Sequence, residues 1–214
     1  NDTNNLSDVF VYDLQTNTIR RASLNNSNNQ GNSGSFSVFP PAISADGRYV
    51  AFVSTASNLV ANDTNNLSDI FVRDLQTNTT RRVSQSILRL GNSNGASTNL
   101  LSISADGRYV AFNSFASNLV ANDTNGAVDV FVRDLQTNTT GRVSLGNSGN
   151  QGSGISGSPS ISADGRYGAF QSSASNLVTK DTNGAVDIFV RDLHKNTTRR
   201  VSLDNSGNQS NDSS

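Results

Sequence analysis

A repeated unit of about sixty residues constrains the fold of this chain more than any other feature of its sequence. The segment "ISADGRY" begins at residues 43, 103 and 161, which are 60 and 58 residues apart. The triplet "DTN" begins at residues 2, 63, 123 and 181, so a fourth, partial copy precedes the three complete ones. Near-identity between copies indicates a structural unit, because catalytic sites are rarely built in triplicate. The sequence therefore predicts a repeat architecture.

The residue types favour strands and turns over helices. All 17 acidic residues are Asp, and Lys180 and Lys195 are the only lysines among the 16 basic residues. Glu and Lys are favoured on helix surfaces, whereas Asp, Asn, Ser and Gly favour turns. The hydrophobic fraction of 34% is low, but a net charge of only −1 does not fit a disordered chain. We therefore expect a folded, all-β protein with long polar loops.

Each unit contains four strand signals. The segment "ADGR" predicts a hairpin between the first two strands, because Asp and Gly tolerate a positive φ. The second and third strands are apolar at successive positions, which indicates burial on both faces of the sheet. Four antiparallel strands covered on both faces and repeated are typical of a β-propeller blade. In the first complete unit the expected strands are 41–44, 49–53, 70–73 and 82–84.

The strand count predicts three complete blades preceded by a half-blade. The signals for the first two strands occur three times, whereas those for the last two occur four times. The expected units are 1–35 for the half-blade and its linker, then 36–95, 96–154 and 155–214 for the blades. Propellers normally close by pairing first and last strands in one blade. The open half-blade therefore has three explanations: further blades in a longer chain, strands from a partner chain, or an irregular closure.

The segment "ISADGRYVAFVSTASNLVANDTNNLSDIFVRDLQTNTTRRVS" (43–84) resembles the TolB-like, WD-related β-propeller repeats of bacterial exported and surface proteins. The shared features are the S-x-D-G-[RK] hairpin, an aromatic or apolar second strand, and the third strand "DIFVRDL". The resemblance covers nearly the whole chain and implies the fold. For function it implies only a range of roles, because such propellers serve as binding platforms, assembly modules and appendages to enzymes.

Acidic and amide side chains recur before each third strand in the pattern D-x-N-x-x-x-D. Calcium loops supply oxygen ligands at positions one, three, five and seven, although the Glu at position twelve of an EF-hand is missing here. The alternative is that these side chains accept hydrogen bonds from backbone amides and shape the turn. The candidate Ca²⁺ ligands are Asp2, Asn4, Asp8, Asp63, Asn65, Asp69, Asp123, Asn125, Asp129, Asp181, Asn183 and Asp187.

Arginine recurs at fixed positions in the unit, as Arg48, Arg73 and Arg82 show in its first complete copy. We expect these residues to form ion pairs between blades with the repeated Asp residues. The alternative is a ring of guanidinium groups that binds a carboxylated or sulfated glycan. The near-neutral charge predicts no nucleic-acid partner, and no apolar run is long enough to predict membrane insertion.

One stretch departs from the repeat. In "QSILRLGNSNGASTNL" (85–100), Ile87, Leu88 and Leu90 stand where the other units carry Asn, Gly and Ser. An apolar loop of this kind is expected either to dock onto a neighbouring protein or to fill a groove between blades. These three residues are the candidate partner-binding residues.

The residue inventory argues against an enzyme. The chain has no Cys and no Glu, and its one histidine, His194, replaces a repeated Gln in a hairpin turn. A catalytic triad or a zinc site cannot be built from such an inventory. The lack of Cys and Met suits an exported protein, so we expect a secreted, extracellular, periplasmic or cell-surface location.

The sequence therefore predicts a non-catalytic structural or assembly module, stabilised by Ca²⁺ if the recurring loops bind it. Its protein partner is expected to be a second copy of the chain, in a head-to-tail assembly that completes the half-blade, or the remaining blades of a longer chain. The alternatives are a glycan- or protein-recognition propeller and the propeller appendage of a larger secreted hydrolase.

Overall fold

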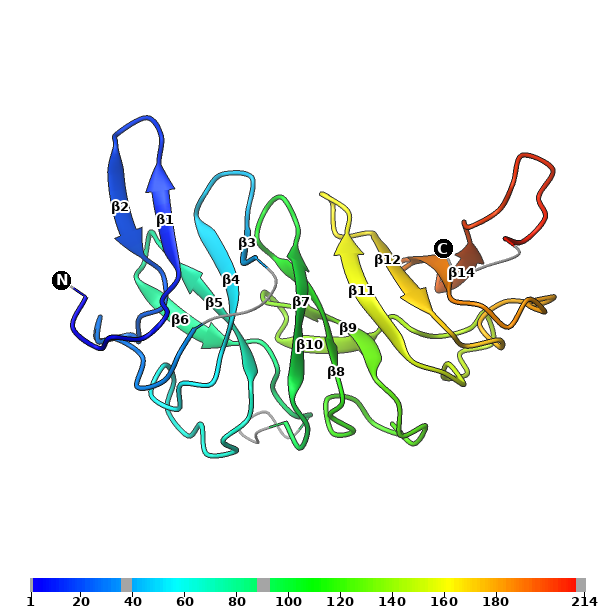
Figure 1. Cartoon of the computed structure of the whole chain (residues 1–214), viewed down its shortest axis with the longest axis horizontal. Helices are drawn as coiled ribbons and strands as arrows, with labels where there is room; N and C mark the ends of the chain where they lie inside the picture. Colours follow the sequence, from blue (N-terminus) through cyan, green and yellow to red (C-terminus); the bar gives the residue numbers. More distant parts are fainter. Residues whose placement is uncertain (1, 36–39, 88–92, 211–214) are drawn as a thin grey trace.

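Three four-stranded antiparallel sheets and one two-stranded sheet lie side by side along an arc (Figure 1). The structure is a computed structural model that describes residues 2–35, 40–87 and 93–210. The half-blade contains β1 (Phe10–Asp13) and β2 (Thr18–Arg21). The blades contain β3 (Ala42–Ile43), β4 (Tyr49–Ser54), β5 (Asp69–Asp74) and β6 (Thr79–Arg82); β7 (Ser97–Ile103), β8 (Tyr109–Ser114), β9 (Asp129–Asp134) and β10 (Thr139–Arg142); and β11 (Ser156–Ile161), β12 (Tyr167–Ser172), β13 (Asp187–Asp192) and β14 (Thr197–Arg200).

The sheet order confirms the predicted all-β propeller blades. Strands that follow one another in the chain are neighbours in each sheet, in the orders β3-β4-β5-β6, β7-β8-β9-β10 and β11-β12-β13-β14. Each complete sheet falls within one of the three predicted ranges, and β1 and β2 fall within residues 1–35. No helix in the described part of the chain is long and apolar enough to cross a membrane.

The core lies between the blades as well as within them. In the first complete blade Phe52 of β4 and Phe71 of β5 pack with ring centroids 5.9 Å apart, and the other two blades repeat this pair. One face of this blade packs towards the half-blade, and Ile70 and Val72 on the opposite face pack towards the second complete blade. Every residue of β5 is consequently buried, which explains its unbroken apolar sequence.

The fourth strand of each blade lies earlier than the sequence signals placed it. We expected it at 82–84, with 74–80 as a polar hairpin, but β6 begins at Thr79. The turn is shorter because Asn78 adopts a left-handed φ of 56°. In addition, Asp74 Oδ1 accepts hydrogen bonds from the amides of Gln76 and Thr77. Asn tolerates this backbone conformation better than most residues, so the chain reverses within four residues.

Candidate functional site

The predicted calcium ligands do come together, but an arginine from the fourth strand lies among them. In the second complete blade, the Arg142 guanidinium lies 3.0 Å from an oxygen of Asp123 and 3.6 Å from an oxygen of Asp129. All three side chains are at least 95% buried. The Asn125 side-chain amide also donates to Asp129 Oδ2 over 3.0 Å. We name this arrangement, in every blade, the Asp–Arg cluster.

The same cluster occurs in all four units. The ion pairs in the other units are Arg21 with Asp2 (3.2 Å) and Asp8 (3.3 Å), Arg82 with Asp63 (3.0 Å) and Asp69 (3.7 Å), and Arg200 with Asp181 (3.1 Å) and Asp187 (3.1 Å). In each unit, both Asp residues belong to the same blade as the arginine with which they pair. A buried guanidinium paired with two carboxylates is stable only when several such contacts are made together.

The Asn of each cluster shapes the turn, as the alternative interpretation predicted. Asn65 Oδ1 accepts a hydrogen bond from the Leu67 amide over 3.1 Å, and Asn125 Oδ1 accepts one from the Ala127 amide over 3.2 Å. The second Asp is held from the other side, since Ser84 Oγ donates to Asp69 Oδ1 over 2.5 Å. Each loop is thus fixed by hydrogen bonds of its own blade at the entry to the third strand.

A calcium ion does not fit this arrangement. Calcium requires six to eight oxygen ligands, but the guanidinium occupies the space between the two carboxylates and the Asn oxygen faces its own turn. In the described part of the chain, no group of three or more His, Cys, Asp or Glu side chains is placed to hold a metal ion. Burial raises the pKa of Asp123, and the charge of Arg142 opposes that rise. Arginine thus supplies the positive charge here, and calcium binding stays a prediction of the sequence pattern alone.

A second repeated ion pair links the first hairpin of a blade to the end of its third strand. Arg48 donates two parallel hydrogen bonds to the carboxylate of Asp74, over 3.0 and 2.7 Å, and its guanidinium lies 4.8 Å from the ring centre of Tyr49. The equivalent pairs are Arg108 with Asp134 and Arg166 with Asp192. In each case hydrogen bonding from the arginine dominates, and it lowers the pKa of Asp134 and of Asp192 to about 2.

The predicted Arg–Asp pairing between blades is wrong, because both kinds of ion pair lie within a blade. Arg73 is one of the arginines that cross a seam, by which we mean the contact between neighbouring blades. It donates to the backbone oxygens of Leu24 and Asn25, over 3.3 and 3.0 Å. It does not pair with its neighbour Asp74, since consecutive strand residues point to opposite faces of the sheet.

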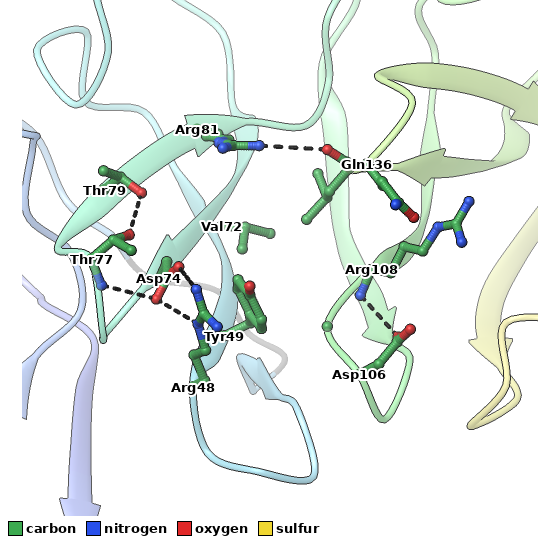
Figure 2. A pocket seen from close by; sticks show the side chains of 12 residues that line it. Arg48, Tyr49, Val72, Asp74, Thr77, Thr79, Arg81, Asp106, Arg108 and Gln136 are labelled. Atoms are coloured by element: carbon green, nitrogen blue, oxygen red, sulfur yellow. Dashed lines mark hydrogen bonds and ion pairs between the residues drawn. The ribbon is translucent and has the colours of Figure 1, made fainter.

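A pocket of about 550 Å³ opens at the seam between the first and second complete blades (Figure 2). Arg48, Tyr49 and Asp74 come from one blade, and Gly107 and Arg108 from the next. The Tyr49 ring packs so closely on Gly107 that a Cβ there would lie 2.1 Å from it. Arg81 at the edge of the pocket donates to the Leu135 backbone oxygen over 3.5 Å. The remaining lining residues are Val72, Thr77, Thr79, Asp106 and Gln136.

The candidate partner-binding loop is described only in part. Ile87 is 51% exposed, and its amide donates to the Asn118 backbone oxygen. Leu88 and Leu90 lie outside the described residues. His194 is exposed in a hairpin turn, where its amide donates to Asp192.

The seam contacts are the site that sequence reasoning missed. Tyr49 and Tyr109 each pack on the glycine of the following blade's first hairpin, which is Gly107 or Gly165. The signal was present, because Tyr follows every "DGR" and Gly is constant two residues before it. Nothing local in the sequence shows, however, that the two halves of this contact belong to neighbouring units.

Comparison with known proteins supports the fold and leaves the function open. No protein-family model matches the chain, and no curated protein matches its sequence. Among solved structures, TolB from Acinetobacter baumannii matches with a TM-score of 0.51 at 18% identity, over 91% of this chain and 37% of that protein. The chain has a TolB-like β-propeller fold. The tricorn protease also matches this chain, with a TM-score of 0.55 at 15% identity, over 89% of this chain and 16% of the protease.

Both matches identify only the fold, because the identities are low. The chain also spans well under half the length of either protein. The activities of those whole proteins are consequently not transferred to it.

Proposed function

We propose that this chain is a non-catalytic propeller segment that acts as a structural or assembly module outside the cytoplasm, in the periplasm or at the cell surface. It contacts a protein partner through its N-terminal half-blade. The observation that carries this proposal is the exposure of Phe10 on β1. Phe10 is 48% exposed, whereas the equivalent Phe71, Phe131 and Phe189 are fully buried.

The missing strands explain this exposure. In a complete blade the second strand supplies a phenylalanine that packs on a phenylalanine of the third strand, as Phe112 does on Phe131 with ring centroids 5.8 Å apart. Within the described residues the half-blade consists of β1 and β2 alone, and Phe10 lies against Arg21, whose guanidinium carbon is 5.2 Å from the ring centre. Burying a phenylalanine contributes about 1.5–3 kcal/mol, so a partner that covers this face gains stability.

Two neighbouring residues that differ from the repeat make the surface of the half-blade more apolar than the equivalent surface of a complete blade. Tyr12 and Ile19 are paired across β1 and β2, where the first complete blade carries Arg73 and Thr80. Tyr12 is 50% exposed and Ile19 is 68% exposed. An apolar pair at this exposed position favours contact with a protein surface over contact with water.

The remaining features support a non-catalytic role. The repeated Asp and Arg side chains neutralise each other within blades, and His194 is exposed in a hairpin turn that Asp192 caps. The absence of Cys and Met from the sequence supports the proposed location outside the cytoplasm.

Light scattering on the purified chain tests the proposal. We expect a molar mass above the 22.6 kDa of one copy, or binding to a co-purified protein at the half-blade. The variant Ile19→Asp is expected to abolish this association, because it places a charge in the apolar contact. Phe115→Asp, at a 61% exposed position in a different loop, is the matched control and should leave it unchanged. A monomer at every concentration, with no bound protein, contradicts an assembly role.

Recognition of a glycan or a protein at the seam pocket is the second candidate function. Arg81 is the residue that supports this function. Its side chain is exposed, and its guanidinium makes one long hydrogen bond, to the Leu135 backbone oxygen. Arg48 and Arg108 favour it less, since Asp74 and Asp134 already bind them. A role as the appendage of a larger secreted hydrolase rests on the fold alone.

A further inference from the structure

Two of the three seams inside the chain are held by a clamp of hydrogen bonds from a linker Asn, whereas Ile87 stands at the equivalent position of the seam between the first and second complete blades. Asn147, in the linker after the second complete blade, binds the edge of the third blade. Its side-chain oxygen accepts from the Thr198 amide over 2.6 Å, and its side-chain nitrogen donates to the Thr198 carbonyl over 3.0 Å. In the linker after the half-blade, Asn26 likewise accepts from the Thr80 amide over 2.5 Å. The clamp binds backbone atoms, so it does not depend on the clamped side chain.

A second contact joins an outer strand of one unit to the hairpin of the next. Arg20 of the half-blade donates to the Leu75 backbone oxygen over 2.6 Å. Arg81 of the first complete blade makes the same contact, over 3.5 Å, to the Leu135 backbone oxygen. The first two seams therefore have an arginine on their upstream side and a hairpin carbonyl on their downstream side. Gly141 replaces the arginine at the third seam.

The two ends of the chain carry the unmatched halves of these contacts. At the C-terminal end Asn205 is equivalent to Asn147, and Arg199 is equivalent to Arg20. Neither side chain has a hydrogen-bond partner or an ion-pair partner among the residues that the structure describes. At the N-terminal end Ile19 is equivalent to Thr198, and Leu14 is equivalent to Leu75. Donors and acceptors of one complete seam are thus present, at opposite ends of the molecule (Figure 1).

The side chains at the two ends are also matched in polarity. At an internal seam, the backbone oxygen of a linker leucine accepts hydrogen bonds from an Arg and a Thr of the next blade. Leu145 is an example, since its oxygen accepts from Arg191 and Thr198. The half-blade has apolar side chains at both of these positions. The corresponding C-terminal residue is Leu203, which is 43% exposed and follows Val201, which is 41% exposed. Apolar surface therefore faces apolar surface when the two ends meet.

From this we propose that the C-terminal blade of one copy docks onto the half-blade of a second copy in the register of an internal seam. Asn205 then clamps the backbone of Ile19, Arg199 donates to the Leu14 carbonyl, and Leu203 packs on the Tyr12–Ile19 pair. The half-blade has no inner hairpin, so this seam uses only the outer half of the blade face. The inference rests on the proposed assembly role and names its partner and contacts.

The number of blade positions indicates how such an assembly closes. The described residues form one half-blade and three complete blades, which occupy four positions, so two such segments give eight. Propellers have four to eight blades around their axis. Two identical seams related by a two-fold axis therefore form a closed ring, whereas an angle that does not close would give a filament. A dimer of twice 22.6 kDa is the expected species.

Cysteine crosslinking tests the register, because the native chain contains no cysteine. Thr18→Cys and Ser206→Cys place thiols beside Ile19 and Asn205. Copies carrying one or the other are mixed and treated with a short bismaleimide. We expect a crosslinked dimer from the mixture only. Thr197→Cys combined with Ser148→Cys in one chain is the positive control, since these residues flank the internal Thr198–Asn147 clamp. Thr18→Cys mixed with Ala121→Cys, in a distant exposed loop, is the negative control.

The outcomes separate this inference from the proposed function. Association without the Thr18–Ser206 crosslink overturns the seam register and leaves the assembly role standing. A chain that stays monomeric and binds no other protein overturns both, whereas a monomer that binds a different protein overturns only the seam between copies. As an independent readout, Asn205→Ala removes two clamp hydrogen bonds from each of the two seams and is expected to weaken dimerisation by at least roughly tenfold. Asn208→Ala, in the same C-terminal turn, is its matched control, and equal weakening by both substitutions also overturns the register.

Discussion

We expect the replacement of Arg82 with methionine to lower the free energy of unfolding by about 3–5 kcal/mol. This is one of the two largest effects that we predict. Arg82 is 3% exposed and neutralises Asp63 and Asp69, which are 4% and 0% exposed. Methionine fills similar volume but leaves two buried carboxylates without a counter-charge. Urea unfolding followed by circular dichroism measures the loss.

The neighbouring arginine provides a matched control. Arg81 lies one residue earlier on β6, is exposed, and makes one long hydrogen bond to a backbone oxygen. Arg81→Met removes the same charge from the same strand, and we expect a loss of less than about 1 kcal/mol. Similar losses for the two substitutions would contradict the assignment of the Asp–Arg cluster as a structural element.

Replacing Gly107 with alanine is the second substitution with a large expected effect. Gly107 has a φ of 73°, and an added Cβ would lie 2.1 Å from the Tyr49 ring. The backbone conformation alone costs an alanine about 1–2 kcal/mol. The clash adds about 1–3 kcal/mol, because the ring must leave the seam. The expected loss in the free energy of unfolding is therefore about 2–5 kcal/mol, measured by denaturant titration.

Gly47 separates these two contributions. It has the same position in its hairpin and a φ of 72°, but its Cβ would meet no atom within 4 Å, because the described half-blade contains β1 and β2 only and so has no equivalent of Tyr49. Gly47→Ala should cost only the backbone part. In a Tyr49→Ala background, the loss in the free energy of unfolding caused by Gly107→Ala should fall to the loss caused by Gly47→Ala. If Gly107→Ala and Gly47→Ala are equally destabilising in the native background, the seam contact is unimportant.

The fold could be predicted from the sequence because of the repeat. The partners of the charged residues in the repeat could not be predicted in this way. Four copies of one pattern identify four-stranded blades, because periodicity and turn residues act locally. The third strand was placed within one residue at each end, since burial on both faces makes it continuously apolar. The fourth strand was placed three residues late, because the left-handed Asn78 shortens the turn and nothing in the apolar pattern signals this.

The candidate site shows the same division between local and non-local information. The spacing of Asp123, Asn125 and Asp129 correctly indicated that their side chains gather. It did not reveal that Arg142, which lies 13 residues after Asp129, enters the same space from an adjacent strand. Calcium and arginine are both cations that carboxylates can bind, so the acidic pattern alone cannot distinguish them.

Thermal unfolding with and without calcium tests most directly whether the four recurring loops are architectural. A cation that binds only the folded chain must raise its unfolding temperature as the cation concentration rises. Because arginine fills each Asp–Arg cluster, we expect the same unfolding temperature in millimolar calcium and in excess chelator. A rise in this temperature that grows with calcium and does not occur with sodium at equal ionic strength would show that the loops are metal sites.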